Sequence, residues 1–93
     1  MQNEITLDKL RKYFALTGLA LEKIKENIFP GKEAEAKEII DMASNYISDA
    51  NHFKEKDDFV NAFGALNYAH GWIDSGVRLG IFNVYDDKLF TVK

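Results

Sequence analysis

The sequence predicts an all-α protein, a three-helix up-and-down antiparallel bundle with a short extended C-terminal tail. Three stretches repeat apolar residues at steps of three and four, a spacing typical of helices that bury one face. Short joints that contain proline, glycine or acidic residues separate them, and such joints turn each helix back against the previous one. We expect a single domain over residues 1–93, with helices at 6–28, 32–55 and 58–79 and a tail at 81–93.

Composition indicates a cytoplasmic protein whose apolar core forms without disulfides or structural metal ions. Of its 93 residues, 46% are apolar and none is cysteine, so disulfides and thiolate metal sites are excluded. The polar N-terminal residues 1–4 show no signal peptide, and no apolar run approaches the roughly 20 residues that span a bilayer. We therefore expect no membrane association and no cofactor.

The charge distribution disfavours nucleic acid as a partner. The net charge is −3, and residues 31–58 hold eight acids against four lysines. A protein that binds phosphates shows a basic stripe instead. The first helix is mildly basic, but its cations are scattered around it and offset by Glu22 and Glu26. These cations are Lys9, Arg11, Lys12, Lys23 and Lys25.

The first predicted helix begins at Thr6, a good N-cap, with Asp8 in its first turn. It ends before the sequence Phe29-Pro30-Gly31, since proline and glycine interrupt helices. Its apolar stripe contains one polar member, a threonine. The stripe consists of Leu7, Leu10, Phe14, Thr17, Leu21, Ile24 and Ile28.

The second predicted helix begins just after Gly31, where Glu33 and Glu35 favour the positive end of the helix dipole. It ends at the polar joint of residues 55–58. Its stripe consists of Ala36, Ile39, Ile40, Ala43, Tyr46, Ile47, Ala50 and Phe53.

The third predicted helix is capped by Asp57 or Asp58 and ends at Gly80, which suits the left-handed C′ position. Each interior glycine costs about 1 kcal/mol relative to alanine, so we expect another backbone to approach this helix closely. The glycines are Gly64, Gly71, Gly76 and Gly80, and the apolar stripe is Phe59, Ala62, Phe63, Leu66, Ala69, His70, Ile73 and Val77.

The last stretch, residues 81–93, has no helical period, and residues 89–92 are β-prone. We expect it to be extended and docked on the bundle, or partly disordered.

Residues 46–53, 58–62 and 68–82 carry a resemblance to a known family. The run Tyr-Ala-His-Gly-Trp at 68–72, followed by Asp74 and by Arg-Leu-Gly at 78–80, resembles an uncharacterised archaeal family, domain of unknown function 357. The resemblance implies a three-helix up-and-down bundle with a left-handed twist, and it implies no activity. The sequence departs from the family's Gly-Asp at positions 57 and 58, where it has two aspartates.

A polar cluster on the third helix has two interpretations. His70, Asp74 and Arg78 lie four residues apart and form a column, with Asn67 beside it. As a site, Asp74 would orient His70 as a general base and Arg78 would bind an anion. The interpretation we favour is a core histidine bonded to Asp74 or to Asp49 of the second helix.

A second cluster of polar residues, His52, Asp49, Asp57 and Asp58, matches no metal-site spacing, so we predict no metal.

Large apolar residues also lie on the wrong side of the third helix. Tyr68, Trp72 and Leu79 lie opposite its core stripe, and Leu16 and Leu19 lie off the stripe of the first helix. Either the tail folds over this second face, or the face binds a partner.

We therefore predict a non-enzymatic protein-interaction or self-association module, a possible homodimer, that uses the aromatic second face of the third helix. The alternative is a nucleotide- or nucleic-acid-binding helical domain that uses His70, Arg78 and the lysines of the first helix.

Overall fold

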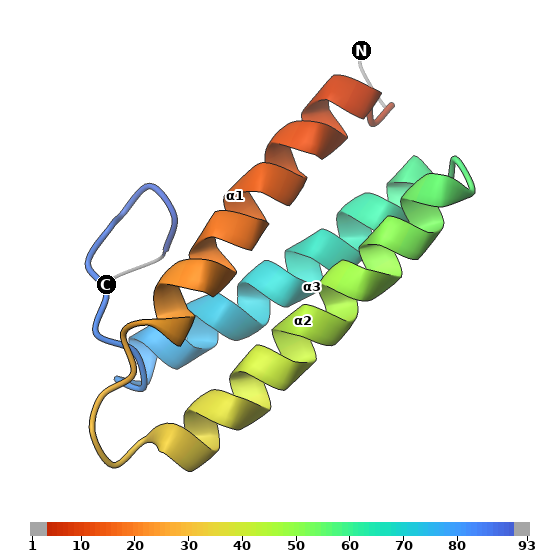
Figure 1. The fold of residues 1–93 in the computed structure, drawn as a ribbon. Coiled ribbons are helices and arrows are strands. Elements are labelled where there is room, and N and C mark those ends of the chain that lie inside the picture. Colours follow the sequence, from red (N-terminus) through yellow and green to blue (C-terminus); the bar gives the residue numbers. More distant parts are fainter. Residues whose placement is uncertain (1–3, 91–93) are drawn as a thin grey trace.

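The computed structural model describes residues 4–90, which form three helices: α1 (Leu7–Lys25), α2 (Glu33–Glu55) and α3 (Phe59–Arg78). The helices run side by side in alternating directions (Figure 1). Their assembly is elongated, with extents of 43 × 24 × 16 Å. Within residues 4–90 there is no strand beyond a single antiparallel bridge between Ile28 and Phe82. The predicted all-α, three-helix bundle is confirmed.

The first helix begins as expected but ends early. The hydroxyl of Thr6 accepts a hydrogen bond from the Lys9 amide at 3.1 Å, which is the predicted N-cap. The helix ends at Lys25, whereas we predicted that it extends to residue 28, because the spacing of apolar residues continues to Ile28. Asn27 donates its side-chain amide to the Lys23 carbonyl at 2.8 Å, and Ile28 forms the bridge with the tail. The period therefore continues past the helix because Ile28 packs on the core from an extended backbone.

Both later helix ends close with the same backbone motif. At the end of α3, Gly80 has φ +75° and donates to the Val77 carbonyl, while Ile81 donates to the Gly76 carbonyl at 3.0 Å. These paired bonds are the Schellman motif, whose left-handed position favours glycine. Gly80 thus occupies the predicted C′ position.

The joint between α2 and α3 repeats this motif with an aspartate at the left-handed position. Asp57 has φ +58°, and its backbone amide donates to the Lys54 carbonyl. The backbone amide of Asp58 donates to the Phe53 carbonyl at 2.9 Å. The carboxylate of Asp58 then accepts the Asn61 amide at 3.2 Å, so Asp58 is the N-cap of α3. The two aspartates thus form a regular Schellman turn, with a non-glycine residue in a conformation that suits glycine.

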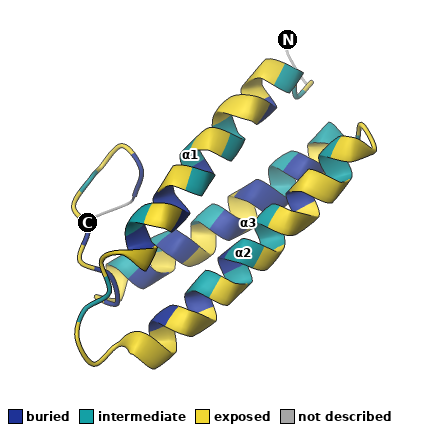
Figure 2. Cartoon of the chain, viewed as in Figure 1, coloured by how far each residue is buried: buried dark blue, intermediate teal, exposed yellow. Residues whose placement is uncertain are grey.

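Small residues bring α2 and α3 together in the most extensive interface of the bundle. Alanines recur at seven-residue spacing on α2, and two alanines and a glycine do so on α3, which lets the two backbones lie close. The apolar side chains of α1 then close the core, and the buried residues line the inward sides of all three helices (Figure 2). The small residues are Ala36, Ala43 and Ala50 on α2 and Ala62, Ala69 and Gly76 on α3.

The tail docks against α1 and α3 at the end of the bundle where α1 finishes (Figure 1). Asn83 donates to the Asn27 carbonyl at 2.7 Å, and Phe29 donates to the Ile81 carbonyl at 3.0 Å. Lys23 forms an ion pair with Asp86 at 3.4 Å. Thr91 and Val92, two of the predicted β-prone residues, lie outside the described residues. The buried residues of the tail are Ile81, Phe82, Val84, Leu89 and Phe90.

The expected close approach of another backbone is wrong for all three glycines within α3. A Cβ built on Gly64 or Gly71 meets no atom within 4 Å. Gly76 is tightly enclosed, but its neighbours are side chains: its Cβ would lie 2.5 Å from the Phe82 ring and 2.8 Å from Ile39. Glycine at position 76 makes room for the tail, whereas Gly64 and Gly71 leave open space on the surface.

None of the helices in residues 4–90 combines the length and the apolarity that crossing a bilayer requires.

Candidate functional site

The side of α3 that faces away from the core carries no charge over four turns. Every exposed residue of α3 before Arg78 is apolar, amide, hydroxyl or glycine, whereas the exposed residues of α2 include six acids and one lysine, Lys37. At 100° per residue these positions fall within an arc of about 140°. We call this set the outer face of α3: Val60, Asn61, Asn67, Tyr68, Gly71, Trp72 and Ser75.

The aromatic residues of the outer face stand beside a hollow of about 350 Å³. Its walls are Asn67, Tyr68, Gly71, Trp72 and Ser75, so it lies where Gly71 has no side chain. Tyr68 is 65% exposed and Trp72 is 38% exposed. Rings of this size bury 150–250 Å² when they find a partner, so their exposure on an uncharged face is a notable departure from an ordinary solvated helix.

Tyr68 is held in place from α2. Its ring stacks on Tyr46 with centroids 5.4 Å apart and planes 25° from parallel. On the other side of Tyr68 a second hollow, of about 200 Å³, opens at Gly64 and also contacts Asp49 of α2. Tyr68 therefore forms a ridge between two hollows, each created by a glycine of α3.

The described part of the tail, residues 81–90, does not cover these aromatics. Its buried side chains pack with Leu21, Ile24 and their neighbours, and Leu79, at the end of the predicted second face, remains 73% exposed. The other predicted members of the face lie on α1. Leu19 is 51% exposed and lines neither hollow, whereas Leu16 is half-buried and lines a third hollow, next to His70.

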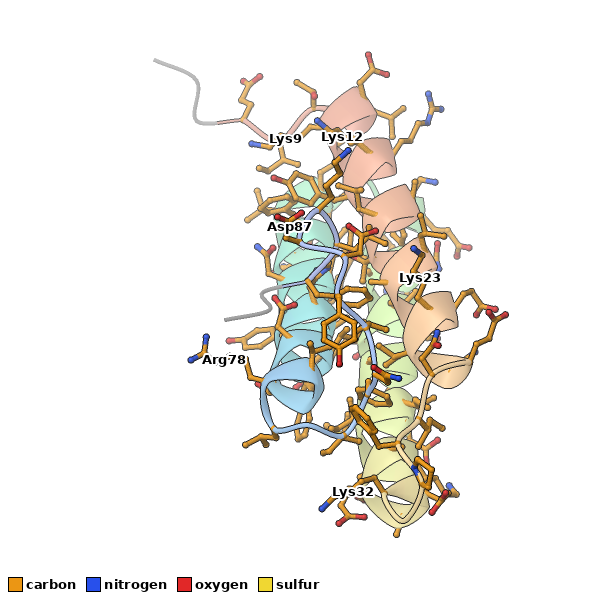
Figure 3. All side chains as sticks on the ribbon, turned by 90° about the vertical axis from the view of Figure 1, so that its left-hand side faces the viewer. Lys9, Lys12, Lys23, Lys32, Arg78 and Asp87 are labelled. Carbon is orange, nitrogen blue, oxygen red and sulfur yellow. The ribbon has the colours of Figure 1, made fainter. Side chains whose placement is uncertain are left out.

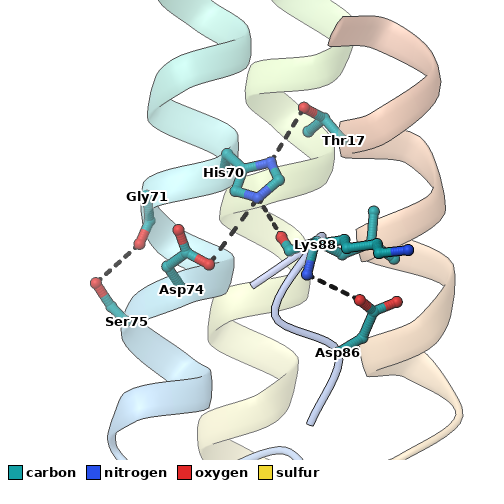
Figure 4. Close-up of polar contacts among 8 residues, drawn as sticks. Thr17, His70, Gly71, Asp74, Ser75, Asp86 and Lys88 are labelled. Carbon is teal, nitrogen blue, oxygen red and sulfur yellow. Dashed lines mark hydrogen bonds and ion pairs between the residues drawn. The ribbon is translucent and has the colours of Figure 1, made fainter. Parts of the chain in front are cut away.

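His70 joins three parts of the chain (Figure 4). Its Nε2 lies 2.6 Å from the Leu89 carbonyl oxygen of the tail, and its Nδ1 lies 3.3 Å from the buried hydroxyl of Thr17 on α1. A carbonyl oxygen has no hydrogen to give, so Nε2 carries a proton and donates it, while Nδ1 shares a hydrogen bond with the Thr17 hydroxyl. Both ring nitrogens are used in holding α1, α3 and the tail together.

The third hollow, of about 370 Å³, lies between α1, α3 and the tail. The Asp74 carboxylate is in its wall, 3.9 Å from His70 Nε2, and Lys88 of the tail contributes another wall. Three of the five predicted polar residues, Asn67, His70 and Asp74, therefore do meet in one place. The complete lining is Tyr13, Leu16, Thr17, Asn67, His70, Gly71, Asp74 and Lys88.

The other two predicted polar residues lie elsewhere. Asp49 lines the hollow at Gly64, so it is not the partner of His70. Arg78 is exposed near the end of α3 and points away from the helices in Figure 3, and it is not in the wall of the His70 hollow.

Sequence reasoning missed Thr17 and Lys88 as neighbours of His70. Thr17 did give a signal, because it is the polar member of an otherwise apolar stripe and is 1% exposed. A buried hydroxyl needs a hydrogen-bonding partner, which directs attention to polar residues at the same level of the bundle. Lys88 gave no such signal, because its position beside His70 depends on the path of the tail, which has no regular secondary structure.

The cations of α1 do not gather at this site. Lys9 lies over the Phe63 ring at 5.5 Å, Lys23 pairs with Asp86, and Lys25 pairs with Glu22 at 3.2 Å. Figure 3 shows Lys9 and Lys12 near the start of α1, away from Lys23 and Arg78. In residues 4–90, no three histidine or acidic side chains are grouped so as to hold a metal ion.

Comparison with known proteins identifies a family but no characterised relative. The family described as "Protein of unknown function (DUF357)" matches residues 12–82, which include all of α2 and α3 and most of α1. No curated protein and no solved structure matches the chain.

Proposed function

Because this chain belongs to the DUF357 family, whose function is unknown, we propose its function from its surface: a non-enzymatic protein-interaction module. Its docking surface is the outer face of α3, with Tyr68 and Trp72 as anchors. Aromatic side chains beside a hollow are the usual energetic centre of a protein interface, since each buries a large area at little entropic cost.

The observation that carries this proposal is the placement of the tail. Among residues 81–90 of the tail, apolar side chains pack over one part of the bundle, yet Trp72 and Tyr68 remain outside that cover. The exposed residues around them carry no charge, which matches the depletion of charge at the centres of interfaces.

The state of His70 argues against catalysis. A general base needs a free nitrogen within reach of its substrate. Both nitrogens of His70 contact protein groups, at 2.6 and 3.3 Å. In this proposal His70 has a structural role, and the aromatic face has the functional one.

A photo-cross-linking experiment tests the proposal. Trp72 is replaced by the photo-reactive amino acid p-benzoylphenylalanine in the full chain, expressed in the cells from which the protein comes. The matched control carries the same group at Ala15, an exposed position of α1. A discrete protein adduct at position 72 and none at position 15 is the expected result. Equal labelling at both positions, or no adduct at 72, would refute the proposal.

The second candidate is binding of a small polar ligand or nucleotide, and the hollow of about 370 Å³ beside His70 favours it. The hollow offers the Asp74 carboxylate and Lys88, although Arg78 and the α1 lysines lie outside its walls. Titration of the protein with ATP, GTP and AMP, followed by chemical shifts of Asn67 and Gly71, tests this candidate. Unchanged shifts at millimolar nucleotide would exclude it.

A further inference from the structure

We propose that the outer face of α3 binds a second copy of this chain, with the two α3 helices antiparallel about a twofold axis beside Tyr68. This inference rests on the proposed function and names the partner. Tyr68 lies in the middle of α3, which runs from Phe59 to Arg78. A twofold axis there places each residue opposite the one equally far from Tyr68 on the other side.

This antiparallel alignment of the two α3 helices sets the protruding side chain of Trp72 in one copy opposite a hollow in the other. Trp72 and Gly64 each lie four residues from Tyr68, in opposite directions. The exposed indole of one copy therefore faces the hollow of about 200 Å³ that Gly64 leaves in the other. Tyr68, supported from behind by Tyr46, meets its own copy on the axis, and paired aromatic rings are favourable neighbours.

The same register pairs polar groups. Ser75 and Asn61 each lie seven residues from Tyr68, and both are exposed and uncharged, so they can exchange hydrogen bonds across the contact.

Charge favours a second copy over a different partner. A twofold axis brings each central residue near its own copy, so a charge at the centre of the contact would repel itself. The outer face has none. Asp74 is mostly buried beside His70. The exposed charges lie at the two ends of α3 and have opposite signs: Arg78 at one end, and the joint at residues 55–58, with three acids and one lysine, at the other. Arg78 and Asp58 are both ten residues from Tyr68, so the antiparallel arrangement brings each arginine to the partner's acidic joint.

The size of the contact sets the expected affinity. Twenty residues of helix give a face about 30 Å long, at 1.5 Å per residue. A face about 10 Å wide then buries roughly 600 Å² in total, below the roughly 1,200 Å² of stable interfaces, so the contact is a weak and reversible one. We therefore expect weak dimerisation, which becomes visible only as the protein concentration rises.

Sedimentation velocity of the purified full chain, over about 5 μM to 1 mM, tests the dimer. The expected result is a shift from a 10.6 kDa monomer to twice that mass as concentration rises. The Tyr68→Lys variant sets two ammonium groups against each other on the axis and weakens dimerisation about tenfold or more. The Ala15→Lys control adds the same charge on α1 and leaves the dissociation constant unchanged. A wild-type chain that remains monomeric at 1 mM would overturn the inference.

The register is tested by disulfide cross-linking, since the natural chain contains no cysteine. A disulfide needs Cα atoms within about 7 Å, which holds for the two copies of a residue on the axis. Under mild oxidation, Tyr68→Cys is expected to cross-link rapidly. A mixture of Gly64→Cys and Trp72→Cys is expected to give the mixed dimer at least about fivefold above either homodimer. The Ala15→Cys control stays uncross-linked, and equal cross-linking at all these positions would refute the register.

The outcomes separate this inference from the proposed function. A monomeric chain whose residue 72 cross-links to a different protein in cells would overturn the second copy and leave the interaction module standing. A monomeric chain with no adduct at residue 72 would overturn both.

Discussion

The Phe82 ring fills the space beside Gly76 that a side chain would otherwise occupy. A Cβ on Gly76 would lie 2.5 Å from Phe82 Cε2, closer than real Cβ contacts. This relationship ties the helix to the tail, because Phe82 can be buried only while position 76 has no side chain. Phe82 is also the bridge partner of Ile28, so the same contact holds the chain between α1 and α2.

The first prediction follows from this contact. Gly76→Ala is expected to lower the free energy of unfolding by about 1–3 kcal/mol, the usual cost of overpacking, despite alanine's higher helix propensity. Gly18→Ala is the matched control. A Cβ at Gly18 meets nothing within 4 Å, so we expect a gain of up to about 1 kcal/mol. Urea denaturation measures both, and equal effects would contradict the explanation. Phe82→Leu should reduce the cost of Gly76→Ala.

The second prediction concerns the joint between α2 and α3. Asp57 has φ +58°, a conformation that costs most residues about 1–2 kcal/mol and costs glycine nearly nothing. Glycine relieves this cost in the folded state but also gives the unfolded chain more conformational freedom, which opposes folding. We expect the net effect of Asp57→Gly to be a stabilisation of about 0.5–1 kcal/mol. The reverse change at the equivalent position of α3, Gly80→Ala, is expected to destabilise, because Gly80 has φ +75°. Thermal unfolding of both variants checks the pair, and a lower Tm for Asp57→Gly would contradict it.

Local signals predicted the helices and their caps. Thr6, Asp58 and Gly80 act within three to five residues of themselves, so their roles are readable from neighbouring sequence. The end of α1 was not readable in this way. Ile28 keeps the apolar step of the helix, but its backbone pairs with Phe82, which lies more than fifty residues away.

In the candidate site, too, the features set by local helical geometry were predicted and those set by distant segments were not. Tyr68 and Trp72 were identified because helical geometry alone places them opposite the core stripe. The partners of His70 were missed because they come from two distant segments, Thr17 of α1 and the Leu89 carbonyl of the tail. The tail has no periodic pattern from which its path could be predicted. Its path depends instead on the space at Gly76 that Phe82 fills, and this space is known only from the folded structure.

The third prediction tests His70 as a structural link. Thr17→Val keeps the shape of the side chain and removes the hydroxyl that His70 Nδ1 contacts at 3.3 Å. We expect a loss of about 1 kcal/mol, the net value of a hydrogen bond in a partly buried setting. A double-mutant cycle with His70→Leu isolates the pair, since Thr17→Val should cost much less once the imidazole is gone. Additive losses would show that the two side chains do not interact.

The fourth prediction concerns acid pH and the turn that begins at Asp86. The carboxylate accepts the Lys88 amide at 2.9 Å, and this bond, together with Lys23, lowers the pKa of Asp86 below its ordinary value of 3.8. A lowered pKa in the folded state means that the carboxylate favours tail docking above about pH 4, and that this contribution is lost as pH falls through the folded value.

We therefore expect tail amides to exchange faster below about pH 4, after correction for intrinsic rates, while the α2–α3 interface stays protected. The amides of Leu89 and Phe90 report this opening, because both donate to the Asp86 carbonyl. Asp86→Asn is the matched variant: it retains an oxygen for the Lys88 amide and cannot titrate. Its tail protection should be lower than wild type at pH 7 and nearly independent of pH between about 2 and 5. A wild-type pH dependence that persists in Asp86→Asn would assign the acid effect to another group.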